Sequence, residues 1–217
     1  PVKGEELKNT PKALEAMDVE FKRLAAKGTF NFSSVREWRE VSAEARRTTK
    51  KLHVGLVFGI CVEKGSELAK DHPERKFKGR SVFQGNNVKD EYAQYAVFQE
   101  LSSNPATMDA SRCVDAYSCF PGNEGEQADA EQAYAQAKMR GAATWVYHPN
   151  GYWPWHFKGV DDPVVHLVYA LYGHPDSGTF WDAKSHNHVI KPGFERVTDW
   201  NSFCLLDRPD AADDMER

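Results

Sequence analysis

The chain has 217 residues, of which 41% are hydrophobic, and a formal net charge of −4. This is enough apolar material for the core of one domain or of two tightly joined lobes. No apolar run approaches the roughly 18 residues that span a bilayer, and the first residues lack the apolar segment of a secretion signal, so we expect an intracellular protein that is not secreted and has no membrane partner.

Charge and cysteines narrow the classes of function. Residues 1–100 hold 19 Lys/Arg against 15 Asp/Glu, whereas residues 101–217 hold 9 against 17. A duplex-binding protein would show a stronger basic excess, because phosphate neutralisation supplies most of its affinity. The four cysteines form neither a Cys-x-x-Cys pair nor a close Cys/His quartet. The sequence therefore predicts reduced thiols and no structural zinc site.

The first hundred residues predict two helices followed by a strand. Thr10 before Pro11 is a favourable start for a helix over 11–27, which Gly28 would end. A capping box at Ser34 predicts a second helix that ends near Lys51. The β-branched, apolar stretch 53–62 predicts a buried strand.

The segment 76–83 alternates in character with the period of a strand. Lys76, Lys78 and Arg80 would share one face, and Phe77 and Phe83 the other. Three cations in a row are suited to holding phosphate oxygens. An exposed edge strand that uses lysines to discourage sheet-to-sheet association would have the same pattern without any ligand.

The middle of the chain predicts a helix over 105–119, a short strand over 126–129 and an alanine-rich helix over 130–139. Asp129, at the end of that strand and before that helix, is placed to bind Mg²⁺ through a carboxylate. The same residue begins an Asp-x-x-Gln pattern with Gln132, so it could instead cap the helix.

The remaining elements complete an α+β fold with a mixed or antiparallel sheet and packed helices. Strands are predicted over 144–147 and 164–169, and Asp176 would begin a helix that runs to Ile190. We expect an N-terminal region over 1–100, a second region over 101–206 and a disordered acidic tail over 207–217.

Five blocks of the chain, taken in order, carry a recognisable pattern. They are Glu15-Ala16-Met17 with Gly28-Thr29-Phe30, Lys76 to Gly85, Asp129 to Tyr134, Val146 to Pro149 with Gly151-Tyr152, and Ala170 to Gly173 with Trp181 and Gly193-Phe194. Together they resemble the reverse transcriptase of copia-type retrotransposon Pol polyproteins. The second block is similar to that family's Tyr-Lys-Ala-Arg-Leu-Val-Ala-Gln-Gly fingers strand, and the third to its Asp-Val-Lys-Thr-Ala-Phe metal-binding motif.

The resemblance implies an RNA-directed DNA polymerase, a nucleotidyltransferase that uses Mg²⁺ and binds an RNA or DNA template-primer. Asp129 would be the catalytic metal ligand beside the Ala130 carbonyl, and Tyr134 would select deoxynucleotides by closing against the ribose. Tyr172 and Gly173 would flank the nucleotide and template. Lys78 and Arg80 would hold the triphosphate, and Lys76 the nucleic acid. Tyr134 could equally be a core aromatic, and Tyr172-Gly173 a strand-to-turn junction.

The chain departs from the family where the second aspartate pair is expected. In place of a Tyr-Val-Asp-Asp hairpin, Leu206 is followed by an acidic, Pro-containing stretch with Asp213-Asp214, which would not form a buried hairpin. We therefore expect the fingers and a partial palm, truncated before that motif and inactive in polymerisation when alone. Two alternatives stay open, a structural or assembly subunit of a larger complex and a non-catalytic nucleic-acid-binding module.

Overall fold

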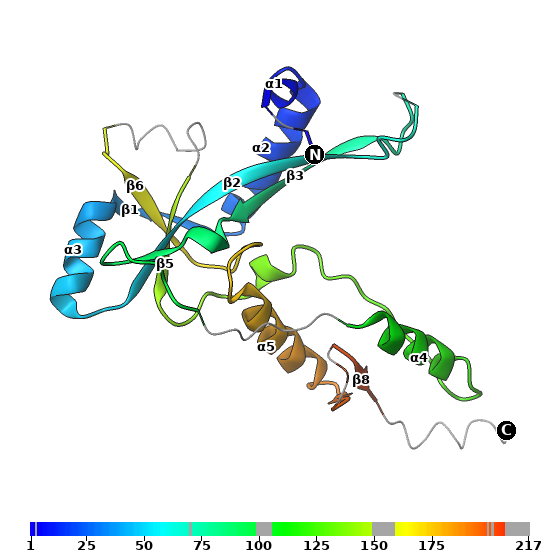
Figure 1. The fold of residues 1–217 in the computed structure, drawn as a ribbon. Coiled ribbons are helices and arrows are strands. Elements are labelled where there is room, and N and C mark those ends of the chain that lie inside the picture. The colour runs from blue at the N-terminus through cyan, green and yellow to red at the C-terminus, as the bar shows by residue number, and fades with distance from the viewer. Residues whose placement is uncertain are drawn as a thin grey trace.

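The computed structural model describes residues 1–2, 4–69, 71–98, 106–148, 159–198, 200 and 202–206. The elements follow in the order shown in Figure 1. The helices are α1 (Gly4–Lys8), α2 (Pro11–Ala26), α3 (Trp38–Thr48), α4 (Met108–Ser118) and α5 (Ser177–Val189), with short 3₁₀ turns η1 (Gly85–Asn87) and η2 (Tyr134–Gln136). The strands are β1 (Phe30–Glu37), β2 (Leu52–Lys64), β3 (Lys76–Phe83), β4 (Lys89–Asp90), β5 (Ala143–Tyr147), β6 (Pro163–Leu167), β7 (Glu195–Arg196) and β8 (Cys204–Leu205).

A mixed sheet organises the fold. Its strand order is β1-β6-β5-β2-β3, and β4 also pairs with β2. The β2–β5 pair is parallel and the other pairs are antiparallel. The first half of β2 lies between β5 and β4, whereas its second half pairs with β3 in a hairpin that projects from the sheet (Figure 1). The α+β class and the mixed sheet expected from the sequence are confirmed.

The two faces of the sheet bury different clusters. Trp145 and Val146 are neighbours in β5 and therefore point to opposite faces. Trp145 packs with Val41 and Ala45 of α3, and Val146 belongs to the larger cluster, which includes Leu24 of α2. That cluster is completed by Phe30, Val57, Phe83, Val88, Ala135, Val165, Leu167 and Leu171.

Most of the predicted elements form close to their expected bounds. The prediction of a helix over 11–27 is confirmed by α2, and those of strands over 53–62 and 76–83 by β2 and β3. The later strands and the helix after Asp176 correspond to β5, β6 and α5. The helix predicted over 105–119 is α4, although residue 105 lies outside the described residues, as do Pro149, Gly151, Tyr152 and the acidic tail over 207–217.

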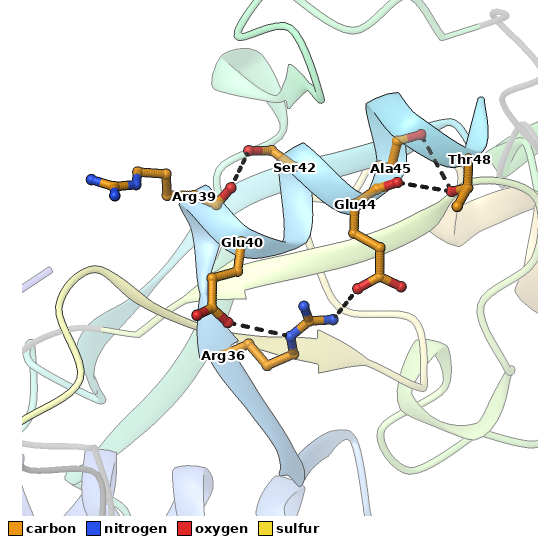
Figure 2. Close-up of polar contacts among 7 residues, drawn as sticks. All are labelled: Arg36, Arg39, Glu40, Ser42, Glu44, Ala45 and Thr48. Atoms are coloured by element: carbon orange, nitrogen blue, oxygen red, sulfur yellow. Dashed lines mark hydrogen bonds and ion pairs between the residues drawn. The ribbon is translucent and has the colours of Figure 1, made fainter.

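The helix predicted from Ser34 begins too early. Residues 34–37 belong to β1, and α3 begins at Trp38. The Ser34 hydroxyl donates to the carbonyl of Asn31 and accepts the amide of His166, so it serves strand pairing instead of a capping box. Arg36 then reaches from β1 to Glu40 and Glu44 of α3 and joins the two elements (Figure 2).

The strand predicted over 126–129 and the helix over 130–139 do not form. Residues 123–130 have no regular structure, and Gln132 adopts a positive φ of 49°. Only the single turn η2 is helical, and Ala137 and Met139 instead exchange hydrogen bonds with the chain after β6. Tertiary pairing therefore overrides the helical preference of the alanines. Because the helix is absent, the interpretation of Asp129 as its cap is wrong.

In the part of the chain that the structure describes, every helix is too short or too polar to cross a lipid bilayer.

Candidate functional site

Three residues from distant parts of the sequence come into contact beside the end of β3. The guanidinium carbon of Arg80 lies 5.5 Å from the ring centroid of Tyr172. The rings of Tyr172 and Tyr134 are 4.7 Å apart between centroids and inclined at 55°. A guanidinium over an aromatic face is attracted by the ring quadrupole. We call Arg80, Tyr134 and Tyr172 the stacked triad.

Backbone contacts fix the stacked triad. The carbonyl of Tyr172 accepts a hydrogen bond from the amide of Phe83, with an N···O distance of 2.7 Å. This bond joins the chain after β6 to the end of β3, the strand that carries Arg80. Tyr134 opens η2, whose next residue, Ala135, is buried in the main core. The triad therefore stands on rigid supports.

Two carboxylates share the surroundings of the Tyr172 phenol. Burial raises the pKa of Tyr172, Arg80 opposes that change, and Tyr134, Glu20 and Asp129 add to it. Asp129 is exposed, and the segment after it is tied to α2. Glu131 accepts from Arg23 at 2.6 Å, and Gln132 donates to Glu20 at 3.4 Å.

Among the described residues, the carboxylates near Tyr172 do not form a metal-binding group. Asp129 and Glu20 both act on Tyr172, but no group of three His, Cys, Asp or Glu side chains is placed to hold an ion among the described residues. Hard divalent cations prefer several oxygen ligands together with substrate phosphates. The roles of Asp129 and of the Ala130 carbonyl as Mg²⁺ ligands therefore stay predictions.

The cationic face of β3 has the expected alternation. Lys76, Lys78 and Arg80 are exposed, whereas Gly79 and Phe83 are buried. Arg80 turns toward Tyr172, and the two lysines line a groove of about 570 Å³ between α2 and the β2–β3 hairpin. Within the described residues, neither lysine has a carboxylate at ion-pair distance. The other residues along the groove are Lys12, Glu15, Ala16, Val19, Glu20, Arg23, Glu63, Arg75, Phe77 and Gly79.

The contribution of α2 to this groove was missed at the level of sequence. Its lining residues recur at helical spacing, from Lys12 through Glu20 to Arg23. That spacing marks one face of the helix, charged except at Ala16 and Val19, which is a usable signal. The apolar residues of the same helix, such as Leu24, indicated only its buried face.

Gly173 has a packing reason to be glycine. Its φ is +88°, and a Cβ atom there would lie 2.1 Å from the carbonyl oxygen of Phe83. Such a distance is far inside van der Waals contact, so no side chain fits. Gly173 thus allows the Tyr172 segment to lie directly on the end of β3. A direct contact of Gly173 with a nucleotide or template stays a prediction.

The chain matches no protein-family model, and neither a curated protein nor a solved structure is similar to it at a significant level.

Proposed function

We propose that the chain is the fingers and part of the palm of a copia-type reverse transcriptase, an intracellular protein that binds nucleotides and template-primer. One observation supports this most. Arg80, Tyr134 and Tyr172 come from three separate blocks of the resemblance, which assigns each of them to the incoming nucleotide, and they lie in contact. A shared nucleotide site requires this convergence.

The chemistry of these groups suits a nucleoside triphosphate. Arg80 offers a planar fork of donors for phosphate oxygens, and Lys78 adds a point charge on the same strand face. The exposed carboxylate of Asp129 would hold Mg²⁺, which would neutralise charge on the phosphates. Tyr134 offers an aromatic wall beside Tyr172 for the sugar or base.

We expect binding without strand extension. Nucleotide joining uses two metal ions roughly 4 Å apart, and several carboxylates must converge to hold them. Asp129 and Glu20 are the acidic groups that act on Tyr172, and the Asp213-Asp214 pair lies outside the described residues. Without the aspartate pair of the family's Tyr-Val-Asp-Asp motif, the rate of nucleotide joining should be lower by several orders of magnitude. Each factor of ten corresponds to about 1.4 kcal/mol of barrier.

Two assays test this proposal. Binding of a fluorescent deoxynucleoside triphosphate should weaken at least tenfold in Arg80→Ala and in Tyr172→Ala. It should be unchanged in Arg112→Ala and Tyr117→Ala, which remove an exposed arginine and an exposed tyrosine on α4. Equal effects of both pairs of substitutions would contradict a nucleotide site at the triad. Primer extension with Mg²⁺ or Mn²⁺ that depends on Asp129 would contradict the expected inactivity.

A role as a structural or assembly subunit is the second candidate, and α4 favours it. Tyr117 and Phe120, on and just after this helix, are 53% and 63% exposed, and their ring centroids are 6.5 Å apart. Exposed apolar groups that adjoin one another mark a site that a partner covers. In this case Lys76, Lys78 and Arg80 would be replaceable without loss of function, and Tyr117→Ser with Phe120→Ser would abolish capture of the partner.

A non-catalytic nucleic-acid-binding module is the third candidate, supported by the unpaired cations Lys76 and Lys78 along the groove. Its affinity for nucleic acid would fall steeply with salt and on neutralisation of these two lysines. Nucleotide binding at the triad, by contrast, would survive their replacement in weakened form.

A further inference from the structure

A second cationic surface lies at the other end of β2, where α3 ends and the turn after β4 begins. Four cations, Arg46, Arg47, Lys50 and Lys51, leave the last turn of α3 and the residues after it, and all are exposed. Lys89 of β4 adds a fifth cation, and Tyr92 and Tyr95 follow it in the turn. We call these seven residues the basic-aromatic patch.

Hydrogen bonds connect the two halves of the patch. Arg46 donates to the carbonyl of Glu91, and the amide of Leu52 donates to the Glu91 carboxylate at 3.0 Å. The turn itself is closed by the amide of Asp90, which donates to the carbonyl of Gln94 at 2.8 Å. These bonds hold the end of α3 and the start of β2 against the turn that carries the two tyrosines.

The carboxylates around the patch are already engaged. One oxygen of Asp90 accepts the amides of Tyr92 and Gln94, both at 2.9 Å. Glu91 is held by Leu52, and Glu44 is directed toward Arg36 at 2.6 Å on the side of α3 that faces β1 (Figure 2). Within the described residues, none of the five patch cations forms an ion pair with a carboxylate. Arg47 and Lys50 still contribute to lowering the pKa of Glu44, after the larger effect of Arg36, so the patch keeps a positive charge that is reduced but not locked in ion pairs.

The two tyrosines are presented to solvent on this rigid turn. Tyr92 is 58% exposed and Tyr95 is 68% exposed. The ammonium of Lys89 lies 3.1 Å from the centroid of the Tyr95 ring, which orients that ring. Exposed aromatic rings held among free cations are the combination that binds single-stranded nucleic acid, because bases stack on the rings while phosphates meet the charges.

The patch is separate from the stacked triad. Val54 pairs with Lys89 and Ile60 pairs with Arg80, six residues further along β2. At the rise of an extended strand these positions are about 20 Å apart. The patch can therefore be occupied independently of the triad, whether or not the triad binds a nucleotide.

We propose that the basic-aromatic patch is a second binding site, specific for single-stranded nucleic acid over duplex and indifferent to base sequence. Bases stack on Tyr92 and Tyr95, while Arg46, Arg47, Lys50 and Lys51 contact successive phosphates. A paired duplex withholds its base faces from the tyrosines, so it gains only the charge contribution. Stacking distinguishes this ligand from an anionic lipid surface, which would need the cations alone.

Fluorescence anisotropy with a labelled 12-residue oligothymidylate, the matching duplex and vesicles of phosphatidylserine tests the proposal. Tyr92→Ala with Tyr95→Ala should weaken single-strand binding by at least fivefold and leave duplex binding unchanged. Lys50→Gln with Lys51→Gln should reduce the slope of log affinity against log salt by about 1.4. Tyr117→Ala, which removes an exposed tyrosine from the acidic half of the chain, is the matched control. Thermal melting checks that each variant is folded.

Photocrosslinking distinguishes this site from the triad. A bromouridine oligonucleotide should crosslink to the peptide that contains Tyr92 and Tyr95, and this product should persist in Arg80→Ala and Tyr172→Ala. Single-strand affinity that is insensitive to the two tyrosines would overturn the proposal. So would crosslinks confined to the Lys76–Arg80 strand, or vesicle binding that depends on Lys50 and Lys51 while oligonucleotide binding does not.

Discussion

Gly85 and Gly173 pack backbone against backbone where the end of β3 meets the chain after β6. A Cβ atom built on Gly85 would lie 2.1 Å from the carbonyl oxygen of Gly173. The contact brings the residue beside Gly173, Tyr172, onto the strand that carries Arg80. The integrity of the stacked triad therefore depends on two residues that have no side chain.

Replacement of Gly173 should destabilise the fold more than replacement of other glycines in the same backbone conformation. Gly173→Ala must adopt a positive φ and displace Phe83, so we expect a loss of about 3 kcal/mol or more in the free energy of unfolding. Gly122→Ala and Gly141→Ala share the positive φ but meet nothing within 4 Å. They should cost about 1 kcal/mol. Urea denaturation measures the difference, and equal losses at all three positions would show that the close contact is unimportant.

Stability should decline in mild acid because of two buried histidines. Burial lowers the pKa of His148 to about 4, and burial, with a smaller contribution from His53, lowers that of His174 to about 4. Since both values lie below the 6.5 of an unperturbed histidine, the unfolded chain takes up protons first. The free energy of unfolding is therefore highest above pH 6.5 and falls as the pH decreases toward 4. At pH 5 the loss is about 2 kcal/mol for each histidine.

A substitution can isolate the part due to His174. Its Nδ1 accepts the amide of Asp176 at 3.2 Å, and asparagine offers an oxygen near the same position. His174→Asn should be less stable at pH 7 but should lose less between pH 7 and pH 5 than the unmodified chain. His188→Asn, which alters an exposed histidine of α5, should leave the pH profile unchanged. Parallel profiles for all three proteins would exclude His174 as a source of the pH dependence.

Truncation of the buried Leu171 should lower the free energy of unfolding far more than truncation of an exposed leucine. Leu171 is 1% exposed in the main cluster, and its carbonyl also accepts the hydroxyl of Ser177 at 2.7 Å. Leu171→Ala should cost about 2–5 kcal/mol. Leu14→Ala on α2, where the side chain is 44% exposed, should stay within about 0.5 kcal/mol. Chemical denaturation that ranks the two substitutions otherwise would contradict the assignment of the core.

Removal of divalent cations should affect nucleotide binding only weakly. The acidic groups that act on Tyr172 are Asp129 and Glu20, which are fewer than a tightly held ion needs. Addition of EDTA should therefore lower nucleotide affinity by less than about tenfold, or 1.4 kcal/mol. Asp129→Asn should reproduce the effect of EDTA. A loss of several orders of magnitude would instead indicate a complete metal site.

Local patterns in the sequence predicted the elements that have clear end signals or a regular alternation of side chains. Thr10-Pro11 and Gly28 bracket α2, and the alternation of Lys76, Lys78 and Arg80 on β3 is confirmed. The resemblance grouped Arg80, Tyr134 and Tyr172, although no local pattern connects residues so far apart. Their stacking follows from strand pairing and from the glycine contact, which only the folded chain provides.

The errors occur where a tertiary partner competes with local preference. The alanines around Tyr134 favour a helix, but Ala137 and Met139 bond to the chain after β6. Ser34 begins a sequence that fits a capping box, yet its hydroxyl bonds to Asn31 of β1 and to His166 of β6. The groove-lining face of α2 was not predicted, because charged residues on a helix surface are common whether or not they line a groove, whereas apolar spacing indicates a buried face directly.

The unbroken strand β2 has a mechanical consequence. Its first half lies between β5 and β4, and its second half extends outward with β3. Lys89 of the basic-aromatic patch and Arg80 of the stacked triad both pair with β2, so this one strand sets the distance between the two sites. A displacement of the projecting hairpin would therefore act on the same strand that supports the tyrosine turn. A proline introduced at Val57, the point where the pairing partners change, would interrupt this strand and remove a buried residue of the main cluster, so both sites would lose their common support.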